Sequence, residues 1–110
     1  MNITHYDEGD VTIFMLEGRV DSDGVLIMQQ ALQNAAVDKK FKLIIEMSEV
    51  RYINSAGLRV MAEILAYNRE NGGDLRLVAL NPKVARVFEI IGFHKFFQKY
   101  DNILEAMTNF

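Results

Sequence analysis

A single serine stands where this sequence changes from an extended segment to a helix, and its hydroxyl is the group best placed to do chemistry. Ser55 lies in the run Asn54-Ser55-Ala56-Gly57-Leu58. A serine at the start of a helix can accept a hydrogen bond from a backbone N–H that has no partner in the helix. The same N–H groups and the positive end of the helix dipole also favour an added phosphate. Position alone therefore leaves two roles open for Ser55, a helix cap and a phosphorylation site.

The elements on either side of Ser55 follow from their hydrophobic patterns. Residues 42–47 form a nearly continuous apolar run, which is typical of a strand buried on both faces. After Ser55 a helical pattern continues without a breaker as far as Gly72. One stripe of this helix is predicted to face the core, and it consists of Leu58, Met61, Ala62 and Leu65.

The rest of the chain alternates between strand and helix patterns. Strands are predicted at residues 3–6, 11–16 and 75–79, and the first two pair as an antiparallel hairpin. Helices are predicted at residues 21–37, at residues 82–91, which Asn81 caps, and after Asp101. The order ββαβαβαα predicts one α/β domain over residues 1–110, a mixed sheet with helices packed against it. A short edge strand near Phe97 is also expected.

Composition excludes several classes of protein. The 110 residues are 50% hydrophobic and 25% charged, which is ordinary for a globular domain. There is no cysteine, so disulfides and thiolate metal sites are excluded. The net charge of −3 argues against a nucleic-acid surface, and no apolar stretch approaches membrane-spanning length. A cytoplasmic protein that contacts neither nucleic acid nor a membrane is therefore expected.

Three blocks of the sequence resemble the STAS family of anti-sigma factor antagonist domains. The blocks occur in the family's order and cover almost the whole chain. They are Leu16-Glu17-Gly18-Arg19-Val20-Asp21, Val50-Arg51-Tyr52-Ile53-Asn54-Ser55-Ala56-Gly57-Leu58-Arg59-Val60, and Asn81-Pro82-Lys83-Val84-Ala85-Arg86-Val87-Phe88-Glu89-Ile90-Ile91-Gly92-Phe93.

The resemblance implies a regulatory binding protein without cofactors. Ser55 matches the serine that is phosphorylated in the family. By resemblance, the unphosphorylated form binds an anti-sigma factor with serine kinase activity, phosphorylation switches the binding off, and a serine phosphatase reverses it. The family also includes scaffolds and binding subunits of stress-signalling and lipid-transport complexes that are not phosphorylated. Asn54, which stands where the best-known antagonists have Asp, favours this alternative slightly.

A partner surface is predicted around Ser55 and along the helix that follows it. Val60, Ile64 and Tyr67 form a second apolar stripe on that helix, which is either covered by neighbouring helices or exposed to a partner. If the stripe is exposed, Ile64→Glu abolishes partner binding and leaves the fold stable. The predicted contact residues are Asp21, Ser22, Asn54, Ala56, Gly57, Arg59, Val60, Glu63, Ile64 and Tyr67.

Other chemistries find little support in the sequence. A serine hydrolase needs a base near its nucleophile, but the chain has only His5 and His94 and no Gly-x-Ser-x-Gly motif around Ser55. Residues 21–24 look like the start of a calcium loop whose remaining ligands are missing. No glycine-rich phosphate loop is present. Ser22 and Ser48, the other two serines, are predicted to be cap or turn residues.

Overall fold

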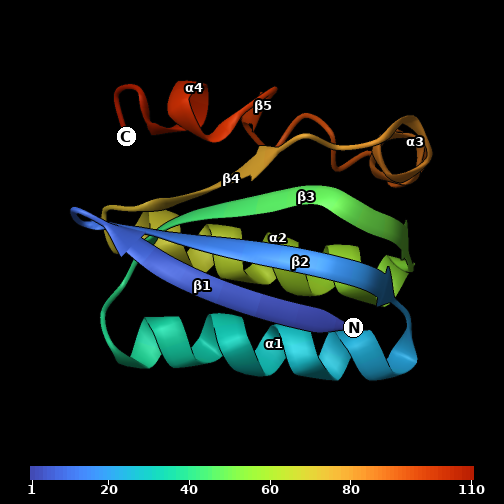
Figure 1. The fold of residues 1–110 in the computed structure, drawn as a ribbon, viewed down its shortest axis with the longest axis horizontal. Helices are drawn as coiled ribbons and strands as arrows, with labels where there is room; N and C mark the ends of the chain where they lie inside the picture. The colour runs from blue at the N-terminus through green and yellow to red at the C-terminus, as the bar shows by residue number, and fades with distance from the viewer.

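A computed structural model describes residues 1–110 and contains one five-stranded sheet and four helices (Figure 1). The strands are β1 (Asn2–Glu8), β2 (Val11–Val20), β3 (Lys42–Ile53), β4 (Asp74–Val78) and β5 (Lys99–Tyr100). The helices are α1 (Ser22–Val37), α2 (Ser55–Glu70), α3 (Pro82–Ile91) and α4 (Ile103–Met107). No helix is long and apolar enough to cross a membrane.

The sheet is mixed, as the sequence predicts. Its strand order is β1-β2-β3-β4-β5, with β1 antiparallel to β2 and every other pair parallel. The tight turn at Gly9, whose φ is 62°, joins the antiparallel pair. Parallel neighbours require crossovers, and α1, α2 and α3 supply them.

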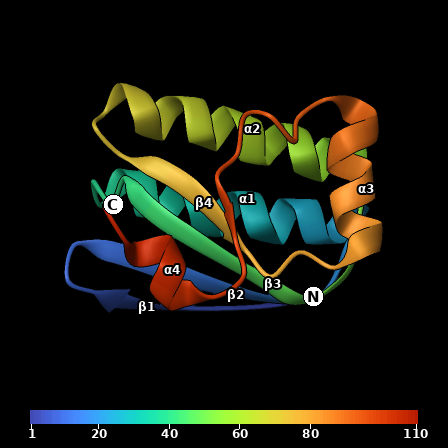
Figure 2. The same cartoon turned by 90° about the horizontal axis from the view of Figure 1, so that it is seen from above.

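Helices cover the two faces of the sheet unequally. Figure 2 shows α1 and α2 together on one side of the sheet and α4 on the other. The larger core lies under α1 and α2, and Met28, Leu32, Met61 and Leu65 from these helices are buried in it. A smaller core of five buried residues, including Ile44 and Ala106, lies under α4. Because β3 is buried on both sides, its residues 43–45 are apolar without alternation.

The central strands run further than the hydrophobic pattern predicts. β3 was expected to end near residue 47, but it continues to Ile53, with Val50 and Ile53 fully or almost fully buried. Its last residue therefore immediately precedes Asn54. The expected edge strand is present as β5, two residues beyond Phe97.

The cap of α3 lies where the sequence predicts, and the cap of α4 is shifted by one residue. Asn81 caps α3 and Pro82 is its first residue, while Gly92 ends it with a φ of 84°. The cap of α4 is Asn102 and not Asp101, because the Asn102 side chain accepts the Glu105 N–H at 2.8 Å.

Candidate functional site

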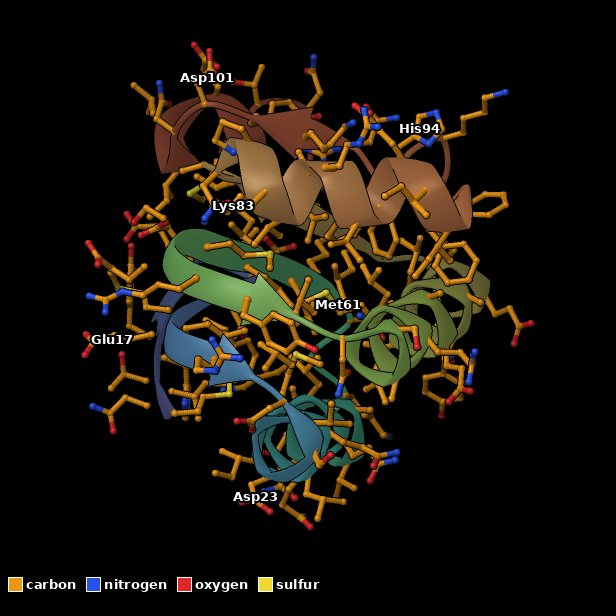
Figure 3. The ribbon with its side chains drawn as sticks, turned by 90° about the vertical axis from the view of Figure 1, so that its right-hand side faces the viewer. Glu17, Asp23, Met61, Lys83, His94 and Asp101 are labelled. Carbon is orange, nitrogen blue, oxygen red and sulfur yellow. The ribbon has the colours of Figure 1, made fainter.

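The starts of α1 and α2 lie side by side at one end of the sheet. Each helix follows directly from the carboxyl end of a strand, α1 from β2 and α2 from β3, and these two strands are parallel neighbours. The backbone N–H of Asn54 donates to the carbonyl of Val20 at 3.0 Å, which joins the two strand-to-helix turns directly. Figure 3 looks onto this end of the sheet, with Asp23 near the start of α1. The structure therefore brings Asp21 and Ser55 to the same edge.

The two turns have the same local structure. In α1 the side chain of Asp21 accepts the Gly24 N–H at 3.1 Å, and in α2 the side chain of Asn54 accepts the Gly57 N–H at 2.8 Å. Each turn thus consists of a cap residue, a serine, one more residue and a glycine. This equivalence places Ser22 in α1 where Ser55 stands in α2, at the first helical position.

Both glycines are required by close packing against the strands. A Cβ on Gly57 would lie 2.8 Å from Val20 Cγ1 and 3.0 Å from Ile53 Cγ1. A Cβ on Gly24 would lie 2.4 Å from the carbonyl oxygen of Arg19. Such distances are too short for a side chain, so each helix approaches its strand only because the residue is glycine. Gly57 was predicted to contact a partner, but it is buried and its role is packing.

Ser55 is the first residue of α2 and does not cap it. Asn54 supplies the capping oxygen, so Ser55 lies beside the cap, and of the two roles left open for it the cap role belongs to the residue before it. The Ser55 side chain is exposed, and its hydroxyl has no hydrogen-bond partner within the chain. With Gly57 bonded to Asn54, the N–H groups of Ser55 and Ala56 remain without a partner inside the helix. The hydroxyl is therefore accessible to a modifying enzyme.

Arg19 and Tyr52 extend the site beyond the residues that the sequence identified. They are paired in the register of β2 and β3, and the Arg19 guanidinium lies 4.3 Å from the centre of the Tyr52 ring. Each stands two residues before a helix cap, so both belong to the same end of the sheet as Ser55. The sequence places each of them two residues before a helix cap, but only the register of β2 and β3 shows that they are neighbours.

The carboxylate of Asp21 is held in its charged form. The hydrogen bond from the Gly24 N–H is the main reason that the pKa of Asp21 lies below its ordinary value, and the charge of Arg19 acts in the same direction. Asp21 therefore presents a negative charge beside the start of α2 at neutral pH. Asn54, in the equivalent position, is neutral.

The second apolar stripe of α2 is covered by the rest of the molecule. Val60 and Ile64 are only 9% and 8% exposed and belong to the main core, where α2 packs beside α1. The prediction that they contact a partner is therefore wrong, because neighbouring elements already cover them. Among the predicted contact residues of α2, the exposed ones near its start are Ala56, Arg59 and Glu63.

Tyr67 is exposed but lies away from the other candidate residues. It is twelve positions after Ser55, which corresponds to about 18 Å along a helix at ~1.5 Å per residue. Its ring packs edge-on against Phe41, with 5.9 Å between the ring centres. Tyr67 thus belongs to the other end of the domain.

The ion pairs of the β1–β2 hairpin and the two histidines form no competing site around Ser55. Lowered pKa values at Asp7 and Asp10 follow mainly from hydrogen bonds with Lys40 and Lys42, and these pairs tie the β1–β2 hairpin to the start of β3. His5 lies beside Phe14 on the hairpin, and no hydrogen bond joins it or His94 to Ser55. No group of three or more His, Asp or Glu side chains is placed to hold a metal ion.

The fold and this site together define a class of protein. It is an α/β domain with an exposed serine, free of hydrogen bonds, at the start of a helix, and a second strand-to-helix turn of the same local structure lies beside it. The model of the STAS domain family matches residues 2–106. The chain therefore belongs to the STAS family.

Relatives of known name agree with this assignment. BtrV of Bordetella bronchiseptica, provisionally named an anti-sigma factor antagonist, is 35% identical over 98 residues, which are 88% of this chain and 84% of BtrV. The crystal structure of a Thermotoga maritima protein with the same provisional description has a TM-score of 0.88 at 27% identity, and the match covers 96% of this chain and 91% of that one. Such names describe regulatory binding proteins and not enzymes, as the sequence analysis predicts for this chain.

A more distant solved structure shares the fold. The Bacillus cell fate determinant SpoIIAA in its phosphorylated form superimposes with a TM-score of 0.74 at 15% identity, and the match covers 96% of each chain. The sheet and helices described above are therefore common to relatives whose sequences have diverged widely.

Proposed function

We propose that this protein is an anti-sigma factor antagonist that phosphorylation of Ser55 switches off. In this proposal the unphosphorylated form binds an anti-sigma factor with serine kinase activity and thereby releases a sigma factor. The observation that carries the proposal is the state of Ser55: an exposed hydroxyl, without a hydrogen bond, on a helix that another residue caps. The names of BtrV and of the Thermotoga protein support the antagonist role.

The phosphate changes the surface without disrupting the fold. The kinase transfers the terminal phosphoryl group of ATP to Ser55 Oγ, the hydroxyl proton leaves to a base of the kinase, and ADP is released. The product carries about −1.5 to −2 charges at the N-terminal end of a helix, where negative charge is favourable. Because the serine is the first helical residue and is exposed, no core contact is lost. SpoIIAA, which has this fold, exists in unphosphorylated and phosphorylated forms.

The switch therefore acts at the partner interface. The exposed side chains at this end of the sheet include those of Arg19, Ser22, Asp23, Tyr52, Ser55, Ala56, Arg59 and Glu63, with Asp21 half-buried among them. A phosphate in the middle of this surface adds bulk, charge and a desolvation cost to binding. A loss of about 2 to 3 kcal/mol weakens affinity roughly 30- to 150-fold, which is sufficient for a switch. A serine phosphatase then restores the binding form.

Phosphorylation by the anti-sigma factor kinase of the source organism tests the proposal. The purified protein is incubated with the kinase and ATP, and the modified residue is mapped by mass spectrometry. We expect one phosphate, which maps to Ser55 in the wild type and in Ser22→Ala and is absent from Ser55→Ala. Ser22 is a matched control because it has the same position in the equivalent turn. An unmodified Ser55 would instead indicate the alternative role, a STAS scaffold or binding subunit that is not phosphorylated.

A further inference from the structure

Ser55 has a positively charged neighbour one helical turn away. Arg59 is four residues further along α2, and residues with this spacing lie on the same face of a helix. Both side chains are exposed, and Arg59 makes no ion pair in the structure, not even with Glu63 one turn beyond it. A free guanidinium therefore stands beside the free hydroxyl.

The equivalent turn of α1 lacks both features that favour a phosphate. Four residues after Ser22 stands Leu26, an apolar side chain that is 65% exposed. The cap beside Ser22 is Asp21, whose carboxylate is kept charged by the Gly24 N–H. A phosphate on Ser22 would thus meet a negative charge and no positive one on its own helix. On Ser55 it would meet a neutral amide cap and an arginine.

We propose that Arg59 pairs with the phosphate of phosphorylated Ser55 and is thereby withdrawn from the partner surface. This inference rests on the proposed phosphorylation of Ser55. Arginine binds phosphate through charge-assisted hydrogen bonds, which are stronger than those between neutral groups. Phosphorylation therefore has two effects on the partner: it adds a negative group, and it neutralises a positive group that the unmodified surface offers.

The neighbouring charges leave this pairing available. Arg19 is stacked on Tyr52, and Asp21 lies at the start of the other helix. On α2 itself Glu63 is the nearest acidic residue, and it stands on the far side of Arg59 from Ser55. Along α2 the phosphate and Glu63 are thus the anions within one turn of Arg59, and the phosphate has the larger charge.

Thermal unfolding of protein with phosphoserine installed during translation tests the pairing. Four proteins are compared: wild type and Arg59→Gln, each with serine or phosphoserine at position 55. We expect phosphoserine to raise Tm about 1 to 2 °C more in the wild type than in Arg59→Gln. The difference should disappear in 1 M salt, where the screening length is only ~3 Å. An equal change in Tm in the two backgrounds at low salt would overturn the proposal.

Phosphoserine at position 22 provides the control. Because Leu26 replaces the arginine and Asp21 is charged, we expect this modification to lower Tm or to raise it less than phosphoserine at position 55 does. Equal effects at both positions would show that Arg59 and Asn54 are irrelevant, and would also overturn the proposal. The design needs no kinase and no partner, so its failure is distinguishable from a failure of Ser55 to act as the switch.

Discussion

Replacing Gly57 with alanine tests the packing that positions Ser55. The added Cβ would lie 2.8 Å from Val20 Cγ1 and 3.0 Å from Ile53 Cγ1, closer than side chains normally approach. Val20 and Ile53 are 0% and 1% exposed, so neither can move into solvent to make room. Overpacking of this kind costs about 1 to 3 kcal/mol. Alanine inside a helix recovers about 1 kcal/mol relative to glycine.

The net effect is a loss of about 1 kcal/mol, or about 4 °C in Tm for a domain of this size. Thermal unfolding followed by circular dichroism measures it. Gly24→Ala is the comparison, because its Cβ would lie 2.4 Å from a backbone carbonyl oxygen, which yields less readily than a side chain. We therefore expect Gly24→Ala to be the less stable of the two. A Gly57→Ala protein that is more stable than wild type would refute the reasoning, since only an uncrowded glycine gains from the change.

Three further predictions concern the cap, the core and the effect of acid. Asn54→Ala should lower stability by about 1 kcal/mol through loss of the cap, whereas Asn54→Asp should retain it, as denaturant titration would show. Ile64→Glu should unfold the protein or lower its Tm by more than 10 °C, because the residue is in the core. Glu63→Ile, at the neighbouring exposed position, should not have this effect. Equal Tm values for the two variants would place Ile64 at the surface. The hydrogen bond from the Gly24 N–H stabilises the charged form of Asp21, so the pKa of Asp21 in the folded protein lies below its ordinary value of 3.8. This hydrogen bond therefore stabilises the folded protein above about pH 4, and its contribution is lost as the pH falls through the lowered pKa. Asp21→Asn should remove that part of the acid dependence and keep the cap, which unfolding at a series of pH values would reveal.

Much of the fold could be read from the sequence because local signals and long-range packing agree. In α1 the apolar residues Val25, Met28, Leu32 and Ala35, which the helical period places on one face, are all buried. Asn81 and Pro82 begin α3 and Gly92 ends it, each for a local reason. The extension of β3 to Ile53 was missed because charged and polar residues interrupt the apolar run after residue 47, although the inward-facing positions remain apolar.

The site was predicted less completely, because its geometry depends on contacts between distant segments. The sequence indicated Ser55 and Asp21, and the structure places their turns together through the hydrogen bond from Asn54 to Val20. Periodicity could not decide whether Val60 and Ile64 were covered, since that depends on where α1 lies. The pairing of Arg19 with Tyr52 depends on strand register, which a single sequence does not specify.

Binding of the anti-sigma factor to three forms of the protein tests the central claim most directly. Isothermal titration compares the unmodified protein with protein that carries phosphoserine at position 55 or at position 22. The account predicts that phosphoserine at position 55 weakens binding by roughly 30-fold or more, because a loss of about 2 kcal/mol or more is expected there, and that phosphoserine at position 22 has a smaller effect. Equal affinities of the unmodified and the position-55 forms would contradict it.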